Sequence, residues 1–214
     1  QRPQPAQPQP AAMPSTSSAP AAVTTFETPN LGGPRKETRG IVVHSTRGQG
    51  KTPAEELQAT LNWFANPKSE VSANAVIGAD GSIHTVGDWD AQTWHAGENN
   101  ASRIGIELVQ SAADNDRGVP FTDAQYRSLA WLTQQMSQRY GFPVNRQTLV
   151  GHEELEQGRR GGKTDPGQSF DWNRYVQEAS APAGGPVALT AAPPAAGLPE
   201  AAPAGVVTDA GRGS

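Results

Sequence analysis

The residues of this chain best suited to chemistry are its four histidines, His44, His84, His95 and His152. His44 ends the apolar run GIVVH and His152 ends TLVGH, so each follows a segment predicted as a strand. Asp165 lies thirteen residues beyond His152. Two imidazoles and one carboxylate form a donor set that binds zinc and leaves a fourth position open for water. Composition alone leaves two alternatives open: a metal site built from these residues, or histidines that are packed or solvated independently.

A candidate nucleotide site at GQGKT, residues 48–52, is rejected by its surroundings. A Walker-type loop needs Gly, four residues and then Gly-Lys-Ser/Thr, and Ser45 stands at the first of these positions. Pro53 places the first helical turn just after the Lys-Thr pair. No later predicted strand ends in the Asp that would hold magnesium. The motif therefore predicts an exposed turn.

Helices that could position the site are expected at three places. The segment 52–66 begins with Thr52 as a cap and Pro53 at the first helical position, and its apolar residues then recur at helical spacing. The segment 121–141 carries a cap at its start, an apolar face and a terminal glycine. Residues 170–179 predict a short closing helix.

Strands are expected between these helices. Short β-branched or apolar runs at 39–45, 103–110 and 146–152 predict buried strands, and two runs within 74–88 joined around Ala-Asp-Gly predict a hairpin. Because strands and helices interleave, we predict one α/β domain with a mixed central β-sheet flanked by helices.

Composition divides the 214 residues into a folded part and two tails. Fourteen of the nineteen prolines lie outside residues 39–178, whereas twelve of the thirteen aromatic residues lie inside. Segments with few large side chains cannot bury enough apolar surface to offset the entropy of ordering them. We therefore predict disordered Pro/Ala-rich segments at 1–38 and 179–214, and a folded domain at 39–178.

Several partner classes are disfavoured by charge and composition. The net charge is −4 and no block of Lys or Arg is present, which argues against nucleic acid. No apolar run approaches the roughly 18–20 residues that cross a bilayer. The chain has no cysteine, so disulfides and thiolate ligands are excluded. The first residue is Gln, which a cleaved export signal would explain.

Six motifs in order resemble one enzyme family: GIVVHST, TWHAG, IGIELV, FTDAQY, VGHEE and KTDPGQSFDW. They are similar to the zinc-dependent N-acetylmuramoyl-L-alanine amidases of the type 2 family, which also includes phage lysozyme-amidases and peptidoglycan recognition proteins. The resemblance covers about residues 39–176. It implies Zn²⁺ as the cofactor, held by His44, His152 and Asp165.

The same resemblance implies a catalytic acid at Glu107 and a catalytic lysine at Lys163. Glu107 stands at the centre of an apolar run, where an ionised carboxylate without a role would be costly. Beside a metal it could take a proton from water, and Lys163 could stabilise the oxyanion. The alternatives are a strand residue that faces solvent and a surface lysine in the polar, flexible segment GRRGGK.

Substrate contacts are expected from Trp94 and His95 in TWHAG, with a structural pair packing a loop as the alternative. Asn74 and Arg103 are further predicted contacts, and His84 is assigned no function. VSANAV at 71–76 departs from the family, because Asn74 replaces a common imidazole and the aromatic hydroxyl kept by some branches is missing. This departure places the substrate contacts in question.

We predict an enzyme that cleaves the bond between the lactyl group of N-acetylmuramic acid and L-alanine in peptidoglycan or muropeptides. The alternatives are a non-catalytic muropeptide-binding module of the same fold and a structural envelope protein that acts through its tails. A monomer in a secreted or cell-envelope location, as an endolysin or autolysin, is expected. A phage lysis protein and a cytoplasmic recycling enzyme are the alternatives for its setting.

Overall fold

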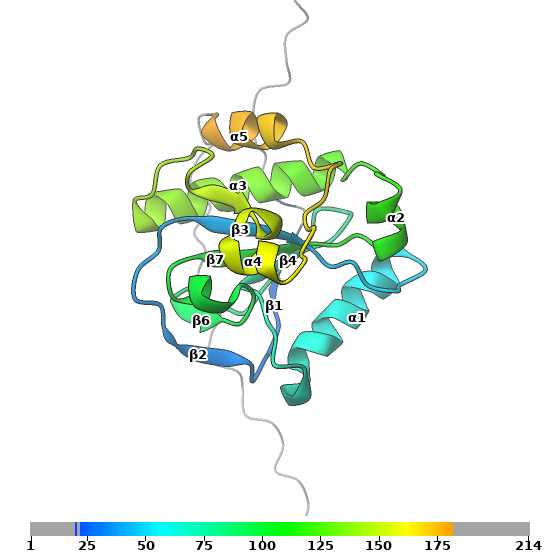
Figure 1. Cartoon of the computed structure of the whole chain (residues 1–214), viewed down its shortest axis with the longest axis horizontal. Coiled ribbons are helices and arrows are strands. Elements are labelled where there is room, and N and C mark those ends of the chain that lie inside the picture. The colour runs from blue at the N-terminus through cyan, green and yellow to red at the C-terminus, as the bar shows by residue number, and fades with distance from the viewer. Residues whose placement is uncertain (1–19, 21, 182–214) are drawn as a thin grey trace, which may run out of the picture.

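A six-stranded β-sheet with strand order β1-β5-β4-β7-β3-β8 forms the centre of the computed structural model, which describes residue 20 and residues 22–181 (Figure 1). The strands of this sheet are β1 (Val23–Thr25), β3 (Ile41–Ser45), β4 (Ala75–Ile77), β5 (Ile83–Thr85), β7 (Ile104–Leu108) and β8 (Leu149–Gly151). The pair β4–β5 is antiparallel and the other neighbours are parallel. A two-stranded antiparallel sheet joins β2 (Leu31–Pro34) to β6 (Ala91–Thr93).

Helices cover both faces of the central sheet. The α-helices are α1 (Pro53–Ala65), α2 (Ala112–Asp116), α3 (Asp123–Tyr140), α4 (Glu156–Arg160) and α5 (Trp172–Ser180). Short 3₁₀ helices are η1 (Pro67–Ser69), η2 (Gly97–Ala101) and η3 (His152–Glu154). The long helix α3 and the closing helix α5 share the main core with the sheet, while α1 packs on a smaller cluster with β4. The predicted α/β domain with a mixed, helix-flanked sheet is confirmed.

The helix ends follow the chemistry of their caps. The Thr52 side chain accepts a hydrogen bond from the backbone of Glu55 at 3.2 Å, and Pro53 opens α1. Helix α3 starts with a reciprocal capping box between Thr122 and Gln125. It ends at Gly141, whose φ of 74° is a left-handed conformation that glycine adopts without steric cost. Both helices therefore begin where the sequence predicts.

Alternation along the central strands decides which side chains face the main core. Ile41 and Val43 on β3 pack toward α3, as do Ile104, Ile106 and Leu108 on β7. Successive side chains of a strand point to opposite faces. The intervening residues, including His44 and Glu107, consequently lie on the opposite face of the sheet.

The folded domain begins earlier than predicted. Strands β1 and β2 both lie within residues 1–38, so the prediction of a disordered segment is wrong for 23–34. Strand β1 joins the sheet by backbone pairing with β5, while its own side chains stay exposed, and composition does not report such pairing. At the other end α5 continues to Ser180. The remaining parts of the two predicted tails, 1–19 and 182–214, lie outside the described residues.

Among the helices that the structure describes, none combines the length and the apolarity of a membrane-crossing segment.

Candidate metal centre and cleft

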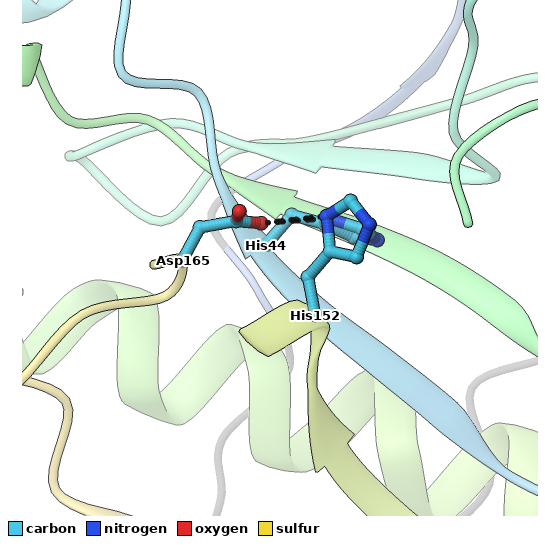
Figure 2. A group of neighbouring side chains, drawn as sticks. All are labelled: His44, His152 and Asp165. Atoms are coloured by element: carbon cyan, nitrogen blue, oxygen red, sulfur yellow. Dashed lines mark hydrogen bonds and ion pairs between the residues drawn. The ribbon is translucent and has the colours of Figure 1, made fainter. Parts of the chain in front are cut away.

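Three side chains from separate elements meet at one edge of the sheet (Figure 2). His44 comes from the end of β3, His152 from η3 directly after β8, and Asp165 from the loop after α4. Asp165 Oδ2 lies 2.9 Å from His44 Nδ1 and 3.3 Å from His152 Nδ1. One ligand atom from each residue lies within 4.8 Å of the others, and all three residues are buried. This geometry makes the trio a candidate metal centre.

Sheet order explains why residues so far apart in the chain meet. Strands β3 and β8 are parallel neighbours, so their carboxyl ends lie at the same edge of the sheet. The loop that carries Asp165 is tied to this edge, because the Glu153 backbone N–H donates to the Asp165 carbonyl at 3.1 Å. Gly151 leaves room for that loop, since a Cβ there would lie 2.8 Å from Pro166 Cδ.

The two histidines present the same nitrogen to the centre and hold the other elsewhere. His44 Nε2 lies 3.0 Å from His95 Nδ1, and His152 Nε2 lies 3.3 Å from Gln157 Oε1. Ligand histidines are commonly fixed in this way through the nitrogen that does not bind the metal. The Nδ1 atoms of both rings are thereby directed at the Asp165 carboxylate.

Electrostatics favour the protonation states that a divalent cation needs. Burial lowers the pKa of His44, which favours the neutral imidazole. Burial opposes ionisation of Asp165, but hydrogen bonds with His152 and His44 outweigh it and hold the pKa of this carboxyl well below its usual range. Two imidazoles and one carboxylate fit zinc in chemistry and in number.

Glu107 lies beside the centre on the same face of the sheet. It pairs with His44 in the β3–β7 register, so the two side chains are neighbours across the strands. Its Oε2 atom is buried and has no hydrogen-bond partner among the described residues. Burial raises the pKa of Glu107 well above its ordinary value, the charge of Asp165 raises it further, and the charge of Lys163 opposes this. A carboxyl group in such surroundings is suited to proton transfer.

Lys163 also lines the cleft, from the loop after α4. Its backbone N–H donates to the Gly158 carbonyl at 2.9 Å. Gly158 itself packs so closely on η3 that a Cβ there would lie 1.9 Å from the His152 carbonyl oxygen. Within the segment GRRGGK, predicted as flexible, Gly158 is buried against η3 inside helix α4, whereas residues 159–163 are exposed.

The candidate centre opens into a cleft of about 790 Å³. One wall is helix α1, and it includes Trp63, which is 53% exposed. Sequence reasoning missed this residue, although a tryptophan outside the apolar stripe of a helix is a signal that could have drawn attention to it.

The loop 46–50 forms a second part of the wall and explains the GQGKT motif. The Glu56 carboxylate accepts hydrogen bonds from the backbone N–H groups of Gly48 and Gly50, both at 2.8 Å. A Cβ on Gly48 would lie 2.3 Å from Glu56 Oε1, so the absence of a side chain lets the carboxylate approach this closely. The motif is a turn capped by a protein carboxylate, and the backbone N–H groups that a phosphate would need are already bonded.

The structure separates the four predicted substrate contacts into two pairs. Trp94 and His95 line the cleft. Asn74 is fully buried, and its Oδ1 atom accepts from Thr93 Oγ1 at 2.8 Å and from the Gly105 N–H at 3.0 Å. We therefore correct its predicted role from substrate contact to a hydrogen-bond hub inside the domain.

Arg103 is likewise placed away from the cleft. Its guanidinium donates to the carbonyls of Thr148 at 3.0 Å and Gln147 at 3.4 Å, which ties the start of β7 to the start of β8. These contacts give Arg103 a structural role. It is not among the described residues that line the cleft, and its substrate contact stays a prediction. His84 lies on β5, where its ring nitrogens lie 2.8 Å from Thr24 Oγ1 and 3.2 Å from Ser82 Oγ.

Comparison with known proteins finds a matching family, similar sequences and similar solved structures. Residues 34–168 match the Amidase_2 family, described as N-acetylmuramoyl-L-alanine amidase. The 1,6-anhydro-N-acetylmuramyl-L-alanine amidase AmpD of Haemophilus influenzae is 39% identical over 114 residues, which are 50% of this chain and 57% of that protein. The chain thus spans little more than half the length of this relative.

Solved structures show the same fold. A crystal structure of a selenomethionine AmpD derivative matches with a TM-score of 0.59 and 27% identity, over 78% of this chain and 98% of that one. The E. coli amidase AmiD, in complex with the substrate anhydro-N-acetylmuramic acid-L-Ala-D-γ-Glu-L-Lys, matches with a TM-score of 0.54 and 23% identity. That match covers 71% of this chain and 60% of AmiD.

Proposed function

Because the chain belongs to the Amidase_2 family of N-acetylmuramoyl-L-alanine amidases, we propose that it hydrolyses the amide bond between N-acetylmuramic acid and L-alanine of a stem peptide. His44, His152 and Asp165 would hold the zinc ion. The observation that carries the proposal is the buried Glu107 Oε2 atom, which has no hydrogen-bond partner in the described part of the chain and lies on the same face of the sheet as His44.

Hydrolysis of this amide adds water across the bond between the lactyl carbonyl carbon and the alanine nitrogen. A zinc ion held by the three donors would polarise the carbonyl and activate the attacking water. Glu107 accepts the proton that the water loses as its oxygen bonds to the carbonyl carbon. Glu107 then gives this proton to the alanine nitrogen as the carbon–nitrogen bond breaks, so the products are the muramic carboxylate and a peptide with a free amine.

Lys163 supplies a positive charge at the same cleft. Negative charge develops on the lactyl carbonyl oxygen during attack, and a cation at the rim of the cleft can stabilise it. The influence of Lys163 on the pKa of Glu107 supports this role, because it means that the two charges act on one another across the cleft. Lys163 also helps to keep Glu107 ionised, as a proton acceptor must be.

The substrate is inferred to be a soluble muropeptide that carries the 1,6-anhydro sugar. The relative from Haemophilus influenzae is named for this substrate, and the AmiD complex contains an anhydromuramoyl peptide. A cleft of about 790 Å³ falls within the range of roughly 300–1,000 Å³ typical of small-ligand sites. It suits a sugar with a short peptide. A preference for fragments over intact wall would favour the recycling role over the secreted, wall-lytic one.

The decisive experiment measures cleavage of anhydromuropeptide and of intact peptidoglycan by mass spectrometry. The purified protein is assayed as prepared, after chelation and after zinc is restored, beside Glu107→Gln and the exposed control Glu27→Gln. We expect zinc-dependent release of free stem peptide that Glu107→Gln loses and Glu27→Gln keeps. Zinc binding without cleavage would make the chain a muropeptide-binding module. A protein that binds no zinc would refute the ligand assignment.

A further inference from the structure

Behind the candidate metal centre, hydrogen bonds connect His44 to the backbone of the neighbouring strand through His95. His44 Nε2 lies 3.0 Å from His95 Nδ1, and His95 Nε2 lies 3.2 Å from the Arg103 carbonyl oxygen. The rings of His44 and His95 meet edge to face, with centroids 5.2 Å apart and an interplanar angle of 88°. This chain of groups connects the TWHAG segment to the ligand on β3.

The direction of these hydrogen bonds follows from their last member. A backbone carbonyl can only accept, so His95 Nε2 must carry the hydrogen that bonds to Arg103. In the neutral His95 ring the other nitrogen, Nδ1, is then an acceptor. His44 then donates to it from Nε2, which leaves the Nδ1 lone pair of the neutral ring for a metal held with Asp165 and His152. Without a metal, the 2.9 Å contact between His44 Nδ1 and Asp165 Oδ2 needs a hydrogen between the two atoms.

A backbone hydrogen bond and a packing contact hold His95 in place, in addition to the two bonds of its ring nitrogens. Its backbone N–H donates to Asn100 Oδ1 at 3.1 Å, and the same oxygen accepts from Ala96. Its ring lies directly over Gly105 of β7, where a Cβ would come within 2.4 Å of His95 Cγ. A glycine two residues before Glu107 thus makes room for an imidazole that contacts His44.

We propose that His95 is a positioning residue for zinc: it accepts the Nε2–H of His44, and so holds that ring with an unprotonated Nδ1 aimed at the metal. This rests on the proposed function for the identity of the cation. His95 also lines the cleft, but both of its ring nitrogens are engaged by the protein, which separates this role from the substrate contact predicted from sequence.

Two substitutions distinguish positioning from simple packing. His95→Phe keeps an aromatic ring over Gly105 but removes the acceptor, so the buried His44 Nε2–H loses its partner. His95→Asn loses the ring but can place an amide oxygen near the position of Nδ1. Packing alone predicts that Phe is tolerated better than Asn, whereas positioning predicts the reverse order. His84→Phe on β5 is the matched control outside the cleft.

The test measures zinc affinity by competition with a chromophoric chelator, in the whole 214-residue chain. We expect His95→Phe to bind zinc about 10–100-fold more weakly than the wild type, as is usual when the partner of a ligand histidine is lost. His95→Asn should stay closer to wild type than His95→Phe, and His84→Phe should be unchanged. Wild-type affinity in His95→Phe, or a larger loss in His95→Asn, would overturn the proposal.

A second readout separates this inference from the proposed function. Nitrogen-15 NMR of the zinc-loaded wild type, with no substrate present, reports which nitrogen of His44 carries hydrogen. A hydrogen on His44 Nε2 supports the His44–His95 bond even if amidase activity is absent, in which case only the proposed function fails. A bare Nε2 on His44 would overturn the positioning role whatever the activity.

Discussion

Replacing Gly105 by alanine should damage the metal centre without touching any of its ligands. The added Cβ would lie 2.4 Å from His95 Cγ and 2.7 Å from both Cδ2 and Nδ1 of that ring. Contacts of this length do not persist in folded proteins, so either the ring or strand β7 must move. The ring moves more easily than the strand, because β7 is held between β3 and β4 in the middle of the sheet.

The expected cost can be worked from the bonds that such a movement breaks. Displacing the ring removes the hydrogen bonds to His44 and to the Arg103 carbonyl, at roughly 0.5–1.5 kcal/mol each, and unpaired buried groups add to this. Residual overpacking costs about 1–3 kcal/mol, while the lower backbone entropy of an unfolded alanine returns about 0.4–1 kcal/mol. We expect the free energy of unfolding to fall by about 2–4 kcal/mol.

Urea unfolding of the metal-free protein, followed by circular dichroism, measures this change. A double-mutant cycle with His95→Ala isolates its cause, because without the imidazole the new methyl group has no ring to meet. Gly33→Ala on β2 is the control, since a Cβ there would have nothing within 4 Å. If Gly105→Ala is as stable as wild type, or costs the same in the His95→Ala background, the proposed contact does not limit this position.

Three further predictions concern the cleft and its support. Lys163→Met should move the acidic limb of the kcat/KM profile to higher pH. The Lys163 charge lowers the pKa of Glu107, so its loss raises the pH needed to ionise that base. An acidic limb that does not move would contradict this coupling. Trp63→Ala should reduce kcat/KM about fivefold, through the loss of about 1 kcal/mol of aromatic contact with substrate, and should leave the melting temperature unchanged. A variant with the kcat/KM of the wild type would show that Trp63 does not contact substrate. Asn74→Leu should lower the free energy of unfolding by about 2–4 kcal/mol, since Thr93 and the Gly105 N–H lose their acceptor. Urea denaturation checks this last value, and a loss of activity at unchanged stability would restore the substrate role.

Local structure could be predicted from the sequence because its causes are local. The Thr52 cap and Pro53 mark the start of α1, and Thr122 and Gly141 bound α3, through contacts within a few residues. The apolar run before His44 is buried on both faces of the sheet, as its composition predicts. Strands β1 and β2 were missed because they join their sheets through backbone pairing, which leaves no apolar pattern.

The members of the candidate site were predicted from resemblance, but their arrangement depends on sheet order. His44 and Asp165 are 121 positions apart in the sequence, and His44 and His95 are 51 apart. No periodicity within one element reports which strands become neighbours, or which side chains then share a face.

For Asn74 and Arg103, the residue type comes from the sequence and the hydrogen-bond partners come from the structure. Both are polar residues near motif segments, which from sequence alone predicts exposure to substrate. In the structure Asn74 bonds to Thr93 and Gly105, and Arg103 bonds to the carbonyls that precede β8. The sequence by itself determined the kinds of groups present and the ends of the main helices. Only tertiary structure decided which polar groups meet one another and which remain free for chemistry, because burial and pairing are properties of neighbours that lie far apart in the chain.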